Sequence, residues 1–146
     1  MKYWIYFYSC VILGSCSSNS TSDKIYDESL YVKVDSIDVT KTGYEILIST
    51  VDTNRKLIKY FWPNGKTQLI AYYYNGYKDG TWRVFMDDGE LISVTRYLNN
   101  KKEGKVLSYH PNGKVATIEE YHQGNAVGTW YYYDSLGILI KTENYK

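Results

Sequence analysis

Residues 80–97 read GTWRVFMDDGELISVTRY, and they carry the pattern that decides the fold. Apolar and polar side chains alternate around Trp82, the chain turns at Asp88-Gly89, and a second alternating run ends at Tyr97. Alternation on both sides of an Asp-Gly pair predicts two antiparallel strands joined by a tight turn. We therefore expect this stretch to form a β-hairpin.

The hairpin recurs with a period of 24 residues, the strongest signal in the sequence. The turn glycines are Gly65, Gly89, Gly113 and Gly137. An aromatic residue lies four positions before each of them, and a tyrosine lies eight positions after, at Tyr73, Tyr97, Tyr121 and Tyr145. A further column of large apolar residues holds Ile58, Trp82, Val106 and Trp130. A column of glycines holds Gly80, Gly104 and Gly128. The sequence predicts an all-β fold, an antiparallel meander of four 24-residue hairpin units.

The turn dipeptides predict the geometry of each hairpin. Asn64-Gly65, like its counterparts in the next two copies, favours a two-residue type I′ turn, in which both central residues have positive φ. In the fourth copy Leu136 takes the first position and would be strained in a type I′ turn, so a looser turn or another turn type is expected there. A second set of turns is expected at Asn75-Gly76, Asn99-Asn100 and Gln123-Gly124.

This turn assignment places Trp62 opposite Thr67 and Phe61 opposite Gln68. Alternation then assigns the columns of Ile58, Thr67 and Tyr73 to one face, and the columns of Phe61 and Ile70 to the other. Both faces mix apolar with charged side chains, which predicts a twisted sheet with a thin core.

The N-terminus predicts export and a lipid anchor. Lys2 precedes an apolar run that ends at Leu13, too short for a helical membrane span of about 20 residues but typical of a secretory signal. Leu13-Gly14-Ser15-Cys16 resembles the bacterial lipobox. The resemblance implies removal of residues 1–15, acylation of Cys16 and attachment to the bacterial cell envelope, at the outer membrane in a Gram-negative cell. The alternative is a plain signal peptide with Cys16 as a bystander.

The remaining boundaries follow from composition. Residues 16–24 are small and polar, which predicts a flexible tether. Residues 25–54 contain two β-prone runs, Tyr31–Val34 and Tyr44–Ile48, and we expect a short N-terminal β segment or cap. Residues 55–146 form the predicted repeat domain.

The repeat resembles a known family. Gly80-Thr81-Trp82, Phe85, Asp88-Gly89-Glu90 and Tyr97 are similar to the bacterial variant of the MORN repeat, as are residues 109–114 and 128–133. The third copy departs from it, with Lys105-Val106 in place of Thr-Trp. The resemblance implies hairpin repeats used for binding or scaffolding. It supplies no catalytic motif, and some bacterial members are labelled antitoxins.

Composition and spacing point away from an enzyme. Without Lys2 the 17 basic residues become 16, equal to the 16 acidic ones, so no nucleic-acid footprint is expected. Both cysteines lie near the N-terminus, and His110 and His122 are expected at opposite edges of the sheet, so no metal site is predicted. Glu119 and Glu143 share a column and are interpreted as an exposed acidic stripe. We expect no catalytic residues and no cofactor.

Two surfaces are candidates for binding. The aromatic columns Trp82, Trp130, Tyr73, Tyr97, Tyr121 and Tyr145 either form structural ladders or stack on sugar rings or partner side chains. The final strand, Gly137 to Lys146, is a candidate edge for strand addition, unless Lys141 and Lys146 discourage pairing. The predicted function is a non-catalytic module that is held at the membrane by its lipid and docks another envelope protein. An antitoxin or immunity protein, and a glycan-binding module, are the alternatives.

Overall fold

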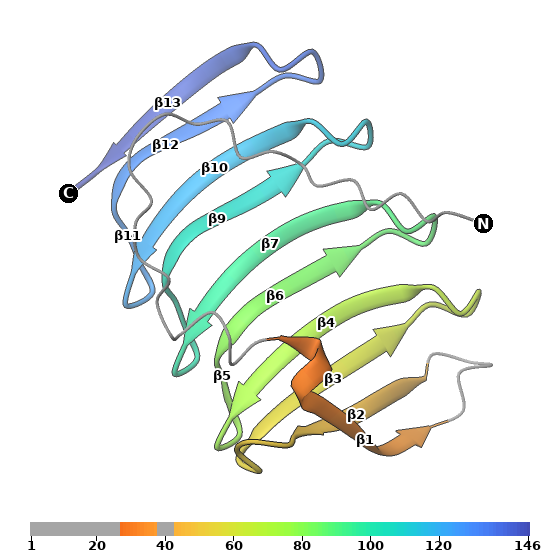
Figure 1. The fold of residues 1–146 in the computed structure, drawn as a ribbon. Helices are drawn as coiled ribbons and strands as arrows, with labels where there is room; N and C mark the ends of the chain where they lie inside the picture. Colours follow the sequence, from red (N-terminus) through yellow and green to blue (C-terminus); the bar gives the residue numbers. More distant parts are fainter. Residues whose placement is uncertain (1–26, 38–42) are drawn as a thin grey trace.

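The computed structural model describes residues 27–37 and 43–146, which form one open antiparallel sheet (Figure 1). Ten strands follow one another along the sheet in the order β1-β2-β3-β4-β6-β7-β9-β10-β12-β13, and three two-residue strands flank this path. The predicted all-β meander of hairpin repeats, preceded by a short β segment, is confirmed. The predicted signal peptide, Cys16 and the tether lie outside the described residues.

The four repeats, called units 1 to 4 below, have the same strand content apart from the short strand that opens units 2 to 4. Unit 1 contains β3 (Arg55–Phe61) and β4 (Thr67–Tyr74). Unit 2 contains β5 (Tyr77–Lys78), β6 (Gly80–Phe85) and β7 (Leu91–Leu98). Unit 3 contains β8 (Lys101–Lys102), β9 (Gly104–Tyr109) and β10 (Val115–His122). Unit 4 contains β11 (Asn125–Ala126), β12 (Gly128–Tyr133) and β13 (Leu139–Tyr145).

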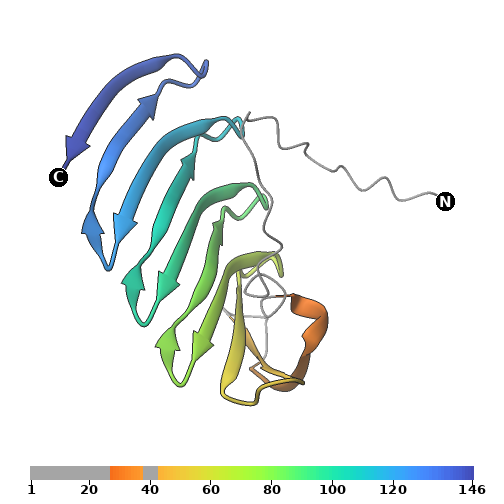
Figure 2. The ribbon, with the colours of Figure 1, turned by 60° about the vertical axis from the view of Figure 1, so that its left-hand side comes forward.

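The N-terminal segment extends the sheet and covers part of one face. It consists of a 3-10 helix, η1 (Glu28–Leu30), followed by β1 (Tyr31–Ile37) and β2 (Tyr44–Ser49), and β2 pairs with β3. Figures 1 and 2 show η1 lying over one face of the curved sheet near β3 and β4. There Tyr31 packs edge-on against Tyr72 at 5.8 Å between ring centroids, above the fully buried Leu57. The compact core of the described residues is therefore small and lies at the N-terminal end.

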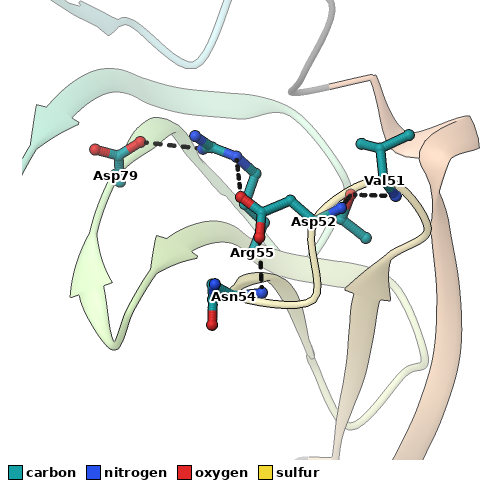
Figure 3. Close-up of polar contacts among 6 residues, drawn as sticks. Val51, Asp52, Asn54, Arg55 and Asp79 are labelled. Atoms are coloured by element: carbon teal, nitrogen blue, oxygen red, sulfur yellow. Dashed lines mark hydrogen bonds and ion pairs between the residues drawn. The ribbon is translucent and has the colours of Figure 1, made fainter.

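Two ion pairs of Arg55 join this segment to units 1 and 2 (Figure 3). Arg55 Nε lies 3.4 Å from Asp52 Oδ2 in the loop between β2 and β3, and Arg55 Nη1 lies 3.5 Å from Asp79 Oδ1. The guanidinium also stacks over the Tyr74 ring, 4.5 Å from its centroid. Because Asp79 is buried, the opposite charge of Arg55 is needed to offset its desolvation.

The predicted type I′ turns at Gly65, Gly89 and Gly113 are wrong in their geometry. The Gly65 N–H donates to Trp62 O and the Trp62 N–H donates to Lys66 O, both at 2.8 Å, which closes a three-residue loop. Gly65 has a φ of +80°, whereas Asn64 does not have positive φ. Its side chain instead accepts the Lys66 N–H at 3.0 Å. The other three turns repeat the two backbone hydrogen bonds.

The fourth turn is likewise not a type I′ turn, as the sequence predicted, and Leu136 therefore avoids the strain that a type I′ turn would impose. Positive φ is confined to Gly137 there. A different side chain stabilises this turn. Asp134 Oδ1 accepts the N–H groups of Leu136 and Ile138, each at 2.9 Å. Leu136 is accommodated because its position does not require positive φ.

True type I′ turns occur at the other ends of the strands, away from the three-residue turns. Asn75 and Gly76 have φ of +50° and +82°, and their flanking residues Tyr74 and Tyr77 pair. The same double positive φ is found at Asn99-Asn100 and at Gln123-Gly124. These are the two-residue loops whose twist matches the flanking strands.

A bulge in every hairpin changes the predicted register. Phe61, not Trp62, pairs with Thr67, and the register shifts between Tyr60 and Phe61. Thr67 therefore belongs with the Phe61 column and not with Ile58, because the extra residue of a bulge interrupts the alternation. Beyond the bulge the prediction is correct, since Ile58 pairs with Ala71 and so shares a face with Tyr73. We call this the aromatic face.

Candidate interaction surfaces

The aromatic face brings the six predicted binding residues into two groups of three. Trp82 lies between Tyr73 and Tyr97, at 5.2 and 5.3 Å between ring centroids. Trp130 lies in the same way between Tyr121 and Tyr145, at 5.1 and 4.4 Å. Each tryptophan thus connects the tyrosine of the preceding unit to the tyrosine of its own unit.

The indole N–H groups close gaps between neighbouring units. Trp82 Nε1 donates to Tyr72 O at 2.9 Å, and Trp130 Nε1 donates to Glu120 O at 3.1 Å. Between β4 and β6 the backbone ladder is short, because it pairs only two residues of each strand. Lys78 Nζ also covers Trp82, 4.4 Å from the ring centroid. These contacts favour the structural interpretation of the aromatic columns.

Hydrogen bonds hold the two glutamates of the acidic stripe as acceptors. Tyr132 and Tyr145 donate to Glu143 Oε2 at 2.7 and 2.8 Å, and Lys141 Nζ lies 2.5 Å from Glu143 Oε1. The Lys141 contact and the two tyrosine hydroxyls lower the pKa of Glu143 to about 2. The hydrogen bond to Glu143 raises the pKa of Tyr132 to about 12. This arrangement keeps Glu143 ionised and does not pair it with a second acid.

Glu119 is held in a similar way. Tyr121 donates to Glu119 Oε2 at 2.9 Å, and burial together with this hydrogen bond raises the pKa of Tyr121 to about 12. The tyrosine therefore remains a hydrogen-bond donor to the carboxylate over the physiological pH range.

The two histidines lie at opposite ends of the strands. His110 Nε2 is 2.8 Å from Tyr133 O, beside the three-residue turns, and His122 Nδ1 is 2.9 Å from Glu103 Oε1, beside the type I′ turns. Within residues 27–37 and 43–146, no group of three or more His, Cys, Asp or Glu side chains is arranged to hold a metal ion. In the same ranges no helix has the length and apolar character to cross a membrane.

Side chains at the three-residue turns link unit 1 to unit 2. Trp62 Nε1 donates to Phe85 O at 3.1 Å, Asn64 Nδ2 to Asp87 O at 2.6 Å, and Lys66 Nζ to Asp88 O at 2.6 Å. Unit 3 is linked to unit 4 by His110, by Asn112 Nδ2 on Ser135 O at 2.6 Å, and by Lys114 Nζ on Leu136 O at 2.8 Å. These inter-unit contacts were not predicted from the sequence.

The junction between units 2 and 3 lacks these links. The corresponding residues of unit 2 are Met86, Asp88 and Glu90, whose side chains have no comparable donors. At this place the surface has a groove of about 490 Å³, lined by Glu90, Leu91, Tyr109, Asn112 and Gly113.

The C-terminal edge exposes a run of large apolar side chains. Leu136 is 70% exposed, Ile138 58% and Ile140 65%, and the neighbouring Leu139 is 49% exposed. In the part of the chain that the structure describes, β13 pairs with β12 alone, so its outer backbone groups face away from the sheet. The aromatic columns thus lie packed on one another, whereas this edge exposes four large apolar side chains within five residues.

The family model described as MORN repeat variant matches residues 102–123. This segment lies in unit 3, the copy whose Lys105-Val106 departs from the other units. No curated protein matches the chain. MORN repeats are generally modules for interaction with proteins or membranes, and they are typically not enzymes. The match covers one of four units of common geometry, so unit 3 is similar to the MORN repeat variant.

Proposed function

We propose that the protein is a lipid-anchored, non-catalytic interaction module of the bacterial cell envelope, which captures another envelope protein by strand addition along β13. The observation that carries the proposal is the exposed apolar run at residues 136–140 on an unpaired edge. Contiguous exposed apolar side chains are uncommon on isolated soluble domains and typically mark interaction sites.

The backbone of β13 has the orientation that strand addition requires. In earlier units, Tyr72 O accepts the Asp79 N–H of the following unit, at 3.1 Å. Asn144 occupies the same repeat position as Tyr72, so its carbonyl points outward. Because strand residues alternate in direction, the N–H and C=O of Thr142 point outward as well. A partner strand would bind to these groups, with specificity from the side chains on either side.

The lysine of this strand, Lys141, is a weaker deterrent to pairing than an unpaired lysine would be. Lys141 is held by Glu143, with 2.5 Å between Nζ and Oε1, so its charge is already countered on the aromatic face. A partner strand that approaches β13 therefore meets a neutral ion pair and the apolar side chains beside it.

The anchor part of the proposal is supported by the sequence. Gly14-Ser15-Cys16 directly follows the apolar run that ends at Leu13, in the pattern of the bacterial lipobox. Two acyl chains on Cys16 would give a stable membrane attachment, where one chain is marginal. An immunity protein would be a special case of the proposed function, in which the captured protein is an incoming toxin. The packing of the aromatic rings on one another makes a sugar platform the less favoured alternative.

Site-specific photocrosslinking in the native envelope tests the docking edge. A photoreactive amino acid at Ile140 samples the β13 edge, and one at Val32, which is 51% exposed on β1, is a matched control at the opposite edge. We expect a discrete crosslinked protein from Ile140 and none from Val32. Crosslinks from Val32 alone, or equal crosslinks from both positions, would contradict docking at β13.

A further inference from the structure

Two lysines of the repeat lie across the turn glycine of the following unit. A Cβ placed on Gly89 would lie 3.8 Å from Lys66 Cδ, and one placed on Gly137 would lie 3.7 Å from Lys114 Cδ. Their ammonium groups end on the carbonyl just before each glycine, Asp88 O and Leu136 O. The chain therefore shows twice how an extended lysine side chain fits between two units.

The same place is vacant between units 2 and 3. Apart from Gly113 itself and its two neighbours in the chain, no heavy atom lies within 4 Å of a Cβ position on Gly113. The carbonyl that corresponds to Asp88 O and Leu136 O is that of Asn112, and no side chain of the described residues donates to it. The groove of about 490 Å³ lies at this position.

The charge at the vacancy is reversed. The repeat position of Lys66 and Lys114 is occupied in unit 2 by Glu90, an exposed residue that lines the groove. None of the ion pairs among the described residues includes Glu90. Leu91 and Tyr109 supply apolar walls along which an aliphatic stem can lie.

We propose that this groove binds a lysine side chain of a partner protein. The aliphatic stem crosses Gly113 against Tyr109 and Leu91, and the ammonium group donates to Asn112 O with Glu90 as its counter-charge. Lysine fits because an ammonium donates three hydrogen bonds and its stem is as slender as those of Lys66 and Lys114. The site lies between units 2 and 3, away from the β13 edge, and does not depend on docking there.

The test is an NMR titration of the ¹⁵N-labelled full chain with the peptide acetyl-Gly-Lys-Gly-amide. We expect saturable shifts centred on the amides of Gly113 and Leu91. The same peptide with its lysine Nε-acetylated is the control and should cause none, because it has lost the charge. Shifts that are absent, or that are equal for the two peptides, would overturn the proposal.

Three variants separate the site from non-specific binding. Glu90→Lys should fill the groove from within and abolish the peptide-induced shifts, whereas Glu90→Gln keeps the space and weakens binding about threefold, the size expected of one exposed ion pair. Lys66→Glu should open a second groove and give new shifts at Gly89. Each variant is compared with the parent spectrum to verify folding. Peptide binding that persists in folded Glu90→Lys would overturn the proposal.

Discussion

At the scale of single residues, each three-residue turn depends on one glycine with left-handed backbone. The φ angles are +80° at Gly65, +95° at Gly89, +76° at Gly113 and +85° at Gly137. Side chains other than glycine, asparagine and aspartate rarely adopt this conformation. The residue before each glycine is under no such constraint, which is why Leu136 is accommodated.

Replacement of Gly89 by valine should therefore destabilise the sheet. A β-branched residue at positive φ is expected to lower the free energy of unfolding by about 1–3 kcal/mol. The nearest atom, Lys66 Cδ at 3.8 Å, is in ordinary contact, so the loss comes from the backbone. Gly89→Asn is the control and should retain most of the stability. A thermal midpoint that Gly89→Val leaves unchanged would contradict the assigned turn.

The contacts of Glu143 predict a loss of order at low pH. Its pKa is lowered from 4.5 to about 2, so the folded chain favours the ionised form more than the unfolded chain does. The resulting stabilisation is present above pH 4.5 and is lost as the pH falls toward 2. The protection factors of the β13 amides, which are corrected for the intrinsic pH dependence of exchange, should therefore fall over this range. Glu143→Gln should remove that dependence, and an identical pH profile in the variant would refute it.

At the scale of elements, the 24-residue period was sufficient to predict the hairpins, but not their turn types. An Asn-Gly pair suits a type I′ turn, and it equally suits a three-residue loop in which Asn64 has ordinary φ and Gly65 is left-handed. Pro63 was the available signal, because its fixed φ favours the first position after Trp62 in such a loop. Because the observed loop has three residues and the predicted loop had two, Thr67 pairs with Phe61 and not with Trp62.

The inter-unit links could be predicted only in part, because each depends on residues 22 or 23 positions apart. The aromatic columns were visible as repeats, whereas the donor role of Trp82 requires the gap between β4 and β6. The vacancy between units 2 and 3 did have a signal, the change from lysine at 66 and 114 to glutamate at 90. Its meaning depends on knowing where Lys66 and Lys114 end.

Substitution at the repeat position of Asn64 should change the free energy of unfolding in opposite directions at two junctions. The junction of units 1 and 2 has the side-chain links, and the junction of units 2 and 3 lacks them. Asn64→Asp keeps the acceptor for the Lys66 N–H but removes the donor to Asp87 O, and should cost about 0.5–1.5 kcal/mol. Asp88→Asn supplies the missing donor at the junction of units 2 and 3 and should stabilise it. Chemical denaturation measures both. Equal effects of the two substitutions would show that the links do not contribute.

At the scale of the whole molecule, the two ends of the sheet differ. The N-terminal end carries the small core, in which Tyr31 covers Leu57 and Tyr72. Val106 is the one buried apolar side chain beyond unit 1 within the described residues, so the later units depend on ring stacking and inter-unit hydrogen bonds. In repeat arrays of this kind, stability is a sum over neighbouring contacts. The C-terminal edge, by contrast, exposes apolar side chains and backbone groups.

The proposed anchor predicts where the protein is found in the cell. Cys16→Ala should release it from salt-washed membranes into the soluble fraction, because no lipid can be attached. Cys10→Ala is the matched control and should leave it membrane-bound, since Cys10 lies within the expected signal peptide. Immunoblotting of the fractions gives the result. Retention of the Cys16→Ala protein in the membrane would disprove a lipid anchor at this position.

The most direct test of the proposed function is partner capture from solubilised envelopes by Thr142→Pro and Thr142→Val proteins. Proline removes the outward N–H of β13 and, at an edge, leaves the ladder to β12 in place, whereas valine keeps the N–H. We predict that Thr142→Val captures the partner as the parent does, and that Thr142→Pro remains folded by circular dichroism but captures none. Undiminished capture by a folded Thr142→Pro protein would contradict docking through the β13 backbone.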